Sequence, residues 1–272
     1  MPIRVLFVTD LTYQARGRRY CDEDIHLSDA LREHFTVSLC HPLDAASLMA
    51  DADVVVVRNS GPVVHYEADY RRFRDEALST GVKVFTELSG KGDQVGKGYL
   101  VELSAAGYPV IPTVDDAADI DRLPDAGTYV VKPRNGADSI GLRTVGRDDL
   151  PGTDLAGMLV QPRVAFEHEV SFYFVDRSFQ YALFAPDPDV RWGLEPYEPT
   201  PADLAFAQRF VDWNDVDHGI QRVDACRTSD GDLLLVELED LNPYLSLDLV
   251  DADRRAAFVA ATADSIGRLA AR

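Results

Sequence analysis

Cysteine is scarce in this sequence of 272 residues, and long hydrophobic runs are missing from it. Its three cysteines form no Cys-x-x-Cys pair, so the sequence predicts neither a disulfide framework nor a cysteine-built zinc site, and it favours a reducing, cytoplasmic location. The longest apolar runs, such as the four valines at 54–57, are far too short to span a bilayer. The first ten residues are typical of a strand rather than of a secretory segment.

Basic residues are also few. Lysine and arginine total 27 against 46 aspartates and glutamates, which gives a net charge of −19. A surface of that sign repels phosphate backbones and anionic headgroups, so we expect neither nucleic acid nor a membrane as a partner. Apolar residues make up 46% of the chain, enough for a real core in two domains or one elaborate domain.

The order of expected elements predicts an α/β part followed by an α+β part. In the first part, β-branched runs alternate with helical stripes and predict a doubly wound, mostly parallel sheet. Its expected strands are 3–8, 36–40, 53–57 and 82–87, and its expected helices are 22–35 and 66–79. Expected later are helices at 98–109, 201–213 and 252–271, a strand or turn at 110–114, strands at 128–133, 142–146, 158–162, 168–176 and 179–186, and a hairpin at 222–240. We therefore predict three parts: an α/β domain at 1–90, a small subdomain at 91–157 and a C-terminal subdomain at 158–272.

Two common nucleotide-binding motifs fail to match. No G-x-G-x-x-G follows the first strand, which argues against a dinucleotide-binding domain. Gly96-Lys97 lacks the earlier glycine and the following Ser/Thr of a phosphate-binding P-loop.

A lysine followed by a loop of small residues is the first candidate site. Lys132 ends an apolar strand, and the loop 135–141, which includes Ser139, follows it. Backbone N–H groups of such a loop can approach phosphate oxygens, and a half-buried lysine needs an anionic partner. The pattern predicts a phosphate clamp; the alternative is a strand-end lysine beside an ordinary hairpin turn.

Acidic residues on a predicted hairpin are the second candidate site. Asp224 lies on one strand, and Glu237 and Glu239 share a face of the other. Converging carboxylates repel one another, which a hard cation such as Mg²⁺ relieves. Asn242 offers a neutral ligand nearby. The alternative, a solvated acidic face, fits poorly with the leucine-rich run around Glu237.

Taken in order, these segments resemble the ATP-grasp superfamily over roughly residues 95–250. The resemblance implies that Lys97 and Lys132 bind the nucleotide phosphates. It also implies that the strand at 158–162 and its continuation, with Gln161 and Val164, hold the adenine edge. Glu169 matches the carboxylate that binds the ribose hydroxyls.

The same resemblance assigns the metal site. Arg222-Val223-Asp224, then Glu237, are similar to the family's Arg-x-Asp and Glu ligand pattern. In D-alanine–D-alanine ligases that pattern ends in Glu-x-Asn, whereas this sequence has Glu239 at the asparagine position. Whether Glu239 or Asn242 ligates the second cation therefore stays open.

Two subgroups show further similarity. The VKP, VQP and RVD segments resemble glutathione synthetase and the ribosomal-protein glutamate ligases. The run from 160 to 184 looks closer to the bacterial branch that includes the D-cycloserine-forming cyclo-ligase. In that branch, an arginine near Arg191 would touch the nucleotide phosphates.

The resemblance implies an ADP-forming ligase that uses ATP and two Mg²⁺ ions, with Mn²⁺ as an alternative. A carboxylate becomes an acylphosphate, which an amine then attacks, with Arg222 and Arg191 as the catalytic arginines. Amino acids or small peptides are the implied substrates, and a homodimer is the implied assembly. Alternatives are ring closure within one molecule, a nucleotide-binding module without turnover, and a kinase.

A basic cluster stands out within this acidic chain. Arg16, Arg18 and Arg19 precede Tyr20 and the acidic run 22–24. This loop is a candidate for binding a substrate carboxylate with the arginines and an amine with the acids. The alternative is a solvated loop followed by an acidic helix N-terminus, where carboxylates are favoured anyway.

Overall fold

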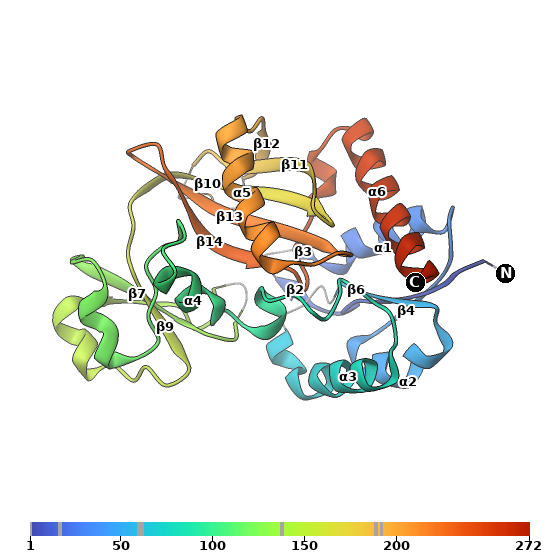
Figure 1. The fold of residues 1–272 in the computed structure, drawn as a ribbon, viewed down its shortest axis with the longest axis horizontal. Coiled ribbons are helices and arrows are strands. Elements are labelled where there is room, and N and C mark those ends of the chain that lie inside the picture. Colours follow the sequence, from blue (N-terminus) through green and yellow to red (C-terminus); the bar gives the residue numbers. More distant parts are fainter. Residues whose placement is uncertain (1, 16–17, 59–62, 137–138, 188–189, 191–192) are drawn as a thin grey trace.

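The computed structural model describes residues 2–15, 18–58, 63–136, 139–187, 190 and 193–272 of the chain. Its strands form a four-stranded parallel sheet, antiparallel sheets of five and three strands, and a short ribbon of two. This arrangement confirms the mixed α/β and α+β class expected from the sequence. In Figure 1 the three-stranded sheet lies to the left and the parallel sheet to the lower right, with the five-stranded sheet above.

The parallel sheet has the strand order β4-β1-β5-β6 and is covered on both faces. Val54 and Val56 pack toward α1 and α6, whereas Val55 and Val57 pack toward α2 and α3. Burial on both faces is why the valine run is continuous rather than alternating. The elements are β1 Arg4–Val8, α1 Cys21–Leu31, β4 Thr36–Cys40, α2 Ala45–Leu48, β5 Val54–Val57, α3 Glu67–Thr80, β6 Val84–Phe85 and α6 Ala252–Ala271.

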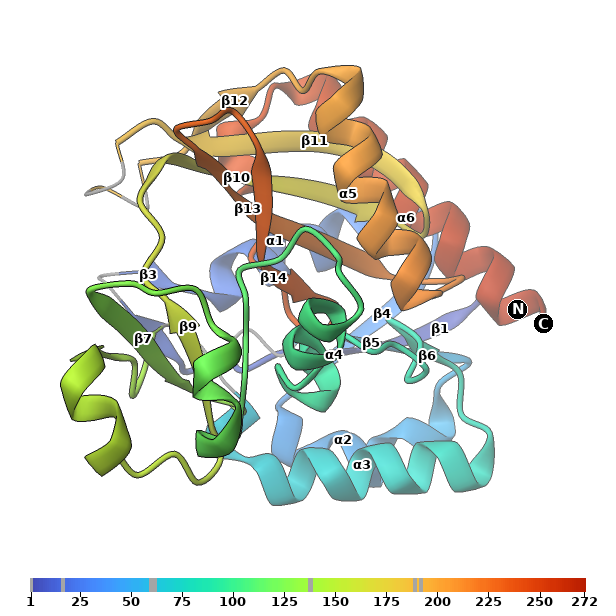
Figure 2. The ribbon, with the colours of Figure 1, turned by 60° about the vertical axis from the view of Figure 1, so that its left-hand side comes forward.

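The five-stranded sheet has the order β12-β11-β10-β13-β14 and joins the two halves of the molecule. One face packs on α4 and α5 through a core that includes Phe172, Phe210 and Leu235. The opposite face shares a core with the parallel sheet, α1 and α6, and Figure 2 shows α5 and α6 beside this sheet. The elements are α4 Tyr99–Ala105, β10 Phe166–Val175, β11 Ser178–Ala185, β12 Glu195–Tyr197, α5 Pro201–Asn214, β13 Ile220–Thr228 and β14 Leu233–Glu239.

The three-stranded sheet has its own core. It consists of β7 Thr128–Pro133, β8 Arg143–Gly146 and β9 Met158–Pro162, in the order β8-β7-β9. Tyr129, Val131 and Val160 are buried within it. Its central strand β7 carries Lys132, so this sheet presents one of the predicted phosphate ligands.

Short elements depart most from the sequence prediction. The segment 110–114 makes only isolated bridges, and the helix expected at 22–35 ends at Leu31. Part of the arginine-rich loop forms a ribbon of β2 (Gln14–Ala15) and β3 (Arg18–Arg19), which is too short to carry a periodic pattern.

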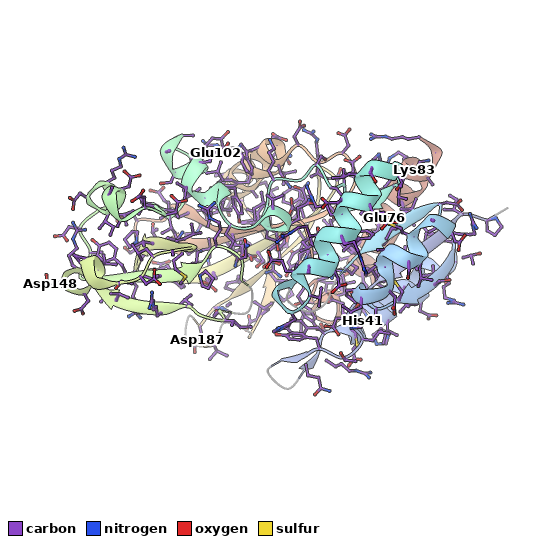
Figure 3. The ribbon with its side chains drawn as sticks, turned by 90° about the horizontal axis from the view of Figure 1, so that it is seen from below. His41, Glu76, Lys83, Glu102, Asp148 and Asp187 are labelled. Carbon is purple, nitrogen blue, oxygen red and sulfur yellow. The ribbon has the colours of Figure 1, made fainter. Side chains whose placement is uncertain are left out.

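Several acidic residues lie on the surface. Glu76, Glu102 and Asp148 are exposed and project from separate elements (Figure 3). Among the described residues, no helix combines the length and the apolar character needed to cross a membrane.

Candidate active site

A cavity of about 230 Å³ opens where the three larger sheets approach one another. Side chains from α1, from the residue after β5 and from β7, β10, β13 and β14 line it. The structure brings nine of the twelve predicted site residues to this one cavity. They are Lys97, Lys132, Ser139, Glu169, Arg222, Asp224, Glu237, Glu239 and Asn242.

The acidic hairpin is in register across its two strands. Asp224 on β13 pairs with Glu237 on β14, and Arg222 pairs with Glu239. Because side chains two positions apart share a face of a strand, all four point to the same side. The sequence prediction that Glu237 and Glu239 share one face therefore extends to both strands.

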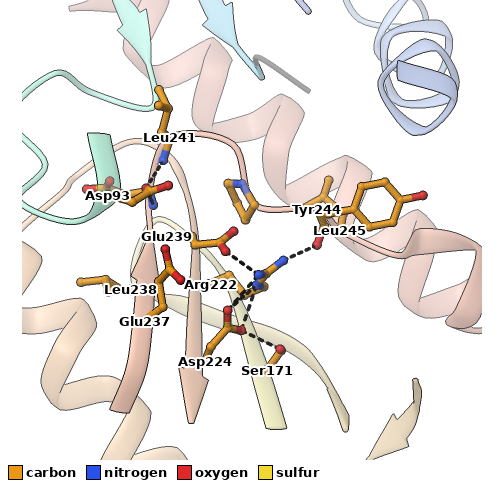
Figure 4. A network of polar contacts seen from close by, with 12 residues as sticks. Asp93, Ser171, Arg222, Asp224, Glu237, Leu238, Glu239, Leu241, Tyr244 and Leu245 are labelled. Carbon is orange, nitrogen blue, oxygen red and sulfur yellow. Dashed lines mark hydrogen bonds and ion pairs between the residues drawn. The ribbon is translucent and has the colours of Figure 1, made fainter. Parts of the chain in front are cut away.

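Arg222 lies at the centre of this group (Figure 4). Its Nε and Nη2 donate to the two oxygens of Asp224 at 2.9 and 2.8 Å, a bidentate pair. Nη2 also donates to Glu239 Oε1 at 2.6 Å, and Nη1 donates to the Tyr244 carbonyl at 3.0 Å. Ser171 Oγ donates to Asp224 at 2.6 Å. Burial opposes the charge of Arg222, but the two carboxylates outweigh it and raise its pKa.

Lys97 reaches the same hairpin from the segment before α4. Its Nζ lies 2.7 Å from Glu237 Oε1, and its backbone N–H donates to the Arg134 carbonyl at 2.9 Å. Burial favours neutral forms of both groups, yet their mutual attraction raises the pKa of Lys97 and lowers that of Glu237. Lys132 adds to the lowering at Glu237. Lys97 thus keeps its charge at this end of the cavity.

At this end of the cavity four carboxyl groups, Asp93, Asp224, Glu237 and Glu239, face three cationic side chains, Arg222, Lys97 and Lys132. Burial, opposed by Arg222 and reinforced by Asp224, raises the pKa of Glu239 to about 8. Burial and the nearby Asp240 and Glu239 raise the pKa of Asp93 well above its usual range. Such a site favours an added cation.

The donor set suits Mg²⁺ bound together with phosphates. Asp224, Glu237 and Glu239 offer carboxylate oxygens, and Asn242 offers an amide carbonyl oxygen. Oxygen atoms of these kinds are the ligands that hard cations take. Within the described ranges, no three His, Cys, Asp or Glu side chains converge closely enough to hold a metal by themselves. Mg²⁺ usually takes one or two carboxylates and completes its shell with water and substrate phosphates, so the residues fit that mode of binding.

Two predicted residues do not line the cavity, and a third is not described. The Gln161 side chain is buried and donates to Thr113 Oγ1 at 2.8 Å rather than lining the cavity. Val164 is half-buried between β9 and β10. Arg191 falls outside the residues that the structure describes. The assignments of all three stay predictions.

The cavity also contains two residues that the sequence analysis did not assign. Arg58 lines it beside Tyr20 and Asp24, and Asp93 lines it beside Lys97. Arg58 had a usable signal, because a charged residue directly follows the buried valine strand β5. Asp93 had none, since it lies in a glycine-rich stretch without periodicity.

Only part of the predicted basic cluster lies within the described residues. Arg19 forms a surface ion pair with Asp22, with 2.5 Å between Nη2 and Oδ1. Arg16 falls outside the described residues. The neighbouring acids Glu23 and Asp24 turn inward and pair with Arg58 instead.

The fold of the chain is similar to that of known proteins. No family model and no curated protein sequence matches the chain. Its structure is similar to that of the D-cycloserine synthetase DcsG, with a TM-score of 0.79 and 22% identity over 98% of this chain and 99% of that one. It is also similar to the D-alanine–D-alanine ligase of Bacillus anthracis, with a TM-score of 0.69 and 14% identity over 99% and 98% of the two chains.

A third structure carries the name of the predicted superfamily. The ATP-grasp ligase PsnB in complex with its minimal precursor matches with a TM-score of 0.66 and 14% identity over 96% of this chain and all of that one (100%). Identities this low establish the fold and leave substrates open. The resemblance inferred from the ordered motifs is thereby confirmed, and the chain has the ATP-grasp fold.

Proposed function

We propose that the chain is an ATP-dependent carboxylate–amine ligase that forms an amide or peptide bond and releases ADP and phosphate. The observation that supports this most is the meeting, on one cavity of an ATP-grasp fold, of cationic phosphate ligands and metal-binding oxygens. These residues are Lys97, Lys132, Arg222, Asp224, Glu237 and Glu239.

The proposed reaction has two steps. A substrate carboxylate oxygen attacks the γ-phosphorus of ATP, the bond from that phosphorus to the bridging oxygen breaks, and ADP leaves. The product is an acylphosphate. An amine nitrogen then attacks the acyl carbon, the carbon–oxygen bond to phosphate breaks, and the amine loses a proton.

Phosphoryl transfer of this kind depends mainly on positioning and charge neutralisation. Lys97 and Lys132 would neutralise phosphate oxygens at their end of the cavity. Arg222 keeps its charge and would stabilise the oxyanion of the second step; such a donor contributes about 3–4 kcal/mol to lowering a barrier. When bound, Mg²⁺ would supply further positive charge to neutralise the phosphates. The residues that would hold it are Asp224, Glu237, Glu239 and Asn242.

Nucleotide release tests the proposal directly. The full chain is incubated with Mg²⁺-ATP and amino acids, singly and in pairs, and ADP and phosphate are measured. Release that depends on a particular acid or pair supports a ligase. Formation of AMP and pyrophosphate, a stable phosphorylated product, or no ATP binding would each contradict it.

A matched pair of variants links turnover to the hairpin. Glu237→Gln removes the charge that pairs with Lys97, so we expect turnover to fall at least 100-fold while unfolding stays cooperative. Glu102→Gln makes the same change on an exposed helix face and should retain activity. Wild-type activity in Glu237→Gln would remove the metal-site assignment.

Ring closure within one molecule is a second candidate. It is favoured by the similarity to the D-cycloserine synthetase, which has higher identity with this chain than the other two structures described. Mass spectrometry of the reaction mixture separates the two candidates. A product formed from one substrate with the loss of water indicates ring closure, whereas a product that combines two substrates indicates joining.

The cellular location and the oligomeric state of the chain also stay predictions. The three cysteines are free and buried, which supports a reducing, cytoplasmic location. Size-exclusion chromatography with light scattering would test the expected homodimer.

A further inference from the structure

A second cavity, of about 250 Å³, lies beside the active-site cavity. It is lined by α3, which packs on the parallel sheet, and by the chain just after β7 of the three-stranded sheet. The two cavities are neighbours, because four residues line both of them: Asp93, Lys97, Gly136 and Asn242. The proposed reaction makes no use of the space on the α3 side.

The helix α3 presents a polar face to this second cavity. The side chains that line it are Glu67, Tyr70, Arg71 and Arg74. Their spacing of three or four residues places them on one side of the helix. Arg134 lines the same cavity from the chain after β7. Three arginines of a chain with a net charge of −19 therefore meet at one cavity.

Arg74 is fixed in place by neutral acceptors. Its Nη1 donates to Gln94 Oε1 at 3.0 Å, and its Nη2 donates to the Leu88 carbonyl at 2.6 Å. Within the described ranges of the chain, Arg74 forms no ion pair with a carboxylate. A guanidinium keeps its charge and has five N–H donors. A fixed one that lines a cavity without an acid partner favours an anionic ligand.

A second polar group lies beside Arg74. The Tyr70 hydroxyl is buried and has no hydrogen-bond partner among the residues that the structure describes. Burial raises the pKa of this hydroxyl and Arg74 opposes the rise, so the hydroxyl and the guanidinium lie close together. Buried polar groups are nearly always paired. A ligand acceptor that reaches both groups would pair the hydroxyl and neutralise the guanidinium.

The other two arginines strengthen the positive field, although each already has an acid partner. Arg71 Nη2 lies 2.9 Å from Glu67 Oε1, on a side chain that is 68% exposed. Arg134 pairs with Asp115, and its side chain is also partly exposed. Such pairs are weak, because solvent screens them. Both guanidiniums are therefore available to a ligand with more than one negative charge.

The remaining lining residues indicate what kind of anion fits. Val63, Val95 and Leu241 add apolar surface. The volume is several times that of a water molecule, which takes about 30 Å³ in the liquid, so an inorganic ion would leave most of the space unfilled. The arginines approach from two separate elements. The three terminal oxygens of a phosphate accept from several directions, whereas the two oxygens of a carboxylate lie in one plane.

We propose that this second cavity binds an organic phosphate monoester, which acts as an effector of the active site. Its phosphate accepts from Arg74 and Tyr70, and its organic group contacts Val95 and Leu241. Because Lys97 lines both cavities, the effector phosphate attracts the same ammonium that the proposed function assigns to the nucleotide. Each anion therefore weakens the binding of the other by the same factor. This effect on the nucleotide rests on the proposed function, whereas the effector site itself does not.

Calorimetry with phenyl phosphate tests whether the site exists. This probe joins a phosphate to an apolar ring, and it is compared with inorganic phosphate, which lacks the ring, and with phenol, which lacks the charge. We expect both of these to bind the full chain at least tenfold more weakly than phenyl phosphate. No binding of phenyl phosphate, or equal binding of inorganic phosphate, would overturn the proposal.

Three variants locate the binding of the probe. Arg74→Gln should weaken it at least tenfold. Arg72→Gln removes an arginine of the same helix that pairs with Asp69 at 3.4 Å outside the cavity, and it should bind phenyl phosphate normally. Lys132→Ala changes a residue that lines only the active-site cavity and should also bind it normally. Binding that is lost in Lys132→Ala but kept in Arg74→Gln would place the probe in the nucleotide site and refute the proposal.

Reciprocal titrations test the effector role. Saturating phenyl phosphate should lower the affinity of the wild-type chain for Mg²⁺-ATP at least threefold, and the decrease should reach a plateau. Saturating Mg²⁺-ATP should lower the affinity for phenyl phosphate by the same factor. A decrease that continues to grow with probe concentration indicates competition for one site and would overturn the effector role, as would an unchanged affinity.

A crystal of the wild-type chain with phenyl phosphate decides the matter if Arg74→Gln does not fold. A phosphate within hydrogen-bond distance of Arg74 supports the site, and a probe bound elsewhere overturns it. Phenyl phosphate bound at Arg74 of a chain that never turns over ATP would reject only the ligase function. Turnover of ATP by a chain that does not bind the probe would reject only the effector site.

Discussion

Asp240 holds together the segment that presents Lys97, and replacing it with alanine should be costly. The residue is fully buried. Its carboxylate accepts from the backbone N–H of Gly92 at 3.0 Å and from Asn214 Nδ2 at 3.0 Å. It also accepts from the backbone N–H of Gln94 at 3.0 Å and from its Nε2 at 3.2 Å. Asp240→Ala therefore leaves four donors without their acceptor.

The expected loss follows from these contacts. A hydrogen bond to a charged group contributes about 1.5–3 kcal/mol, but four bonds to one carboxylate are not additive. Breaking a buried charged network by removing one partner costs about 3–5 kcal/mol, and we expect Asp240→Ala to lower the free energy of unfolding by an amount in that range. Because 92–96 leads directly into Lys97, the affinity for Mg²⁺-ATP should fall as well.

Urea unfolding followed by tryptophan fluorescence measures the free energy, and calorimetry measures nucleotide affinity. Asp264→Ala is the control, because this aspartate is exposed on α6 and should change stability by less than about 1 kcal/mol. A loss below about 1 kcal/mol in Asp240→Ala would refute the view that this carboxylate organises the segment.

Four further predictions follow from single residues. Lys132→Ala should weaken Mg²⁺-ATP binding at least tenfold by calorimetry, and unchanged affinity would contradict its role as a phosphate ligand. Burial raises the pKa of Glu23 to about 7. The folded state then binds the extra proton, so between pH 4.5 and 7 the free energy of unfolding should fall by roughly 3 kcal/mol as pH rises, and urea titrations should show this slope missing in Glu23→Gln. Gly219→Ala should lower the melting temperature because its Cβ would lie 2.3 Å from Thr86 Cγ2. Gly267→Ala meets nothing within 4 Å in a helix and should raise stability by about 1 kcal/mol.

Local pattern predicted most of the regular elements. The valine run 54–57, the hairpin around Gly231 and the Ala-rich C-terminal helix each occur where periodicity and turn residues place them. Elements of two residues, such as β2 and β3, were not predicted, because a period needs several repeats to be recognised.

The sequence alone determined how site residues are placed within a single strand. Glu237 and Glu239 share a face because side chains alternate along any strand, and Lys132 ends its strand wherever that strand packs. Ordered motifs of this kind also predicted the ATP-grasp fold, because their order along the chain is itself a property of the sequence.

Only the tertiary structure decided which distant residues meet. Lys97 and Glu237 are 2.7 Å apart although 140 positions separate them, and Arg58 reaches Pro243 across 185 positions. Such contacts depend on strand order and on the packing of whole sheets, which no local period encodes. The same packing turned Glu23 and Asp24 away from the arginine-rich loop and toward Arg58, because charges buried in the core must find a partner there.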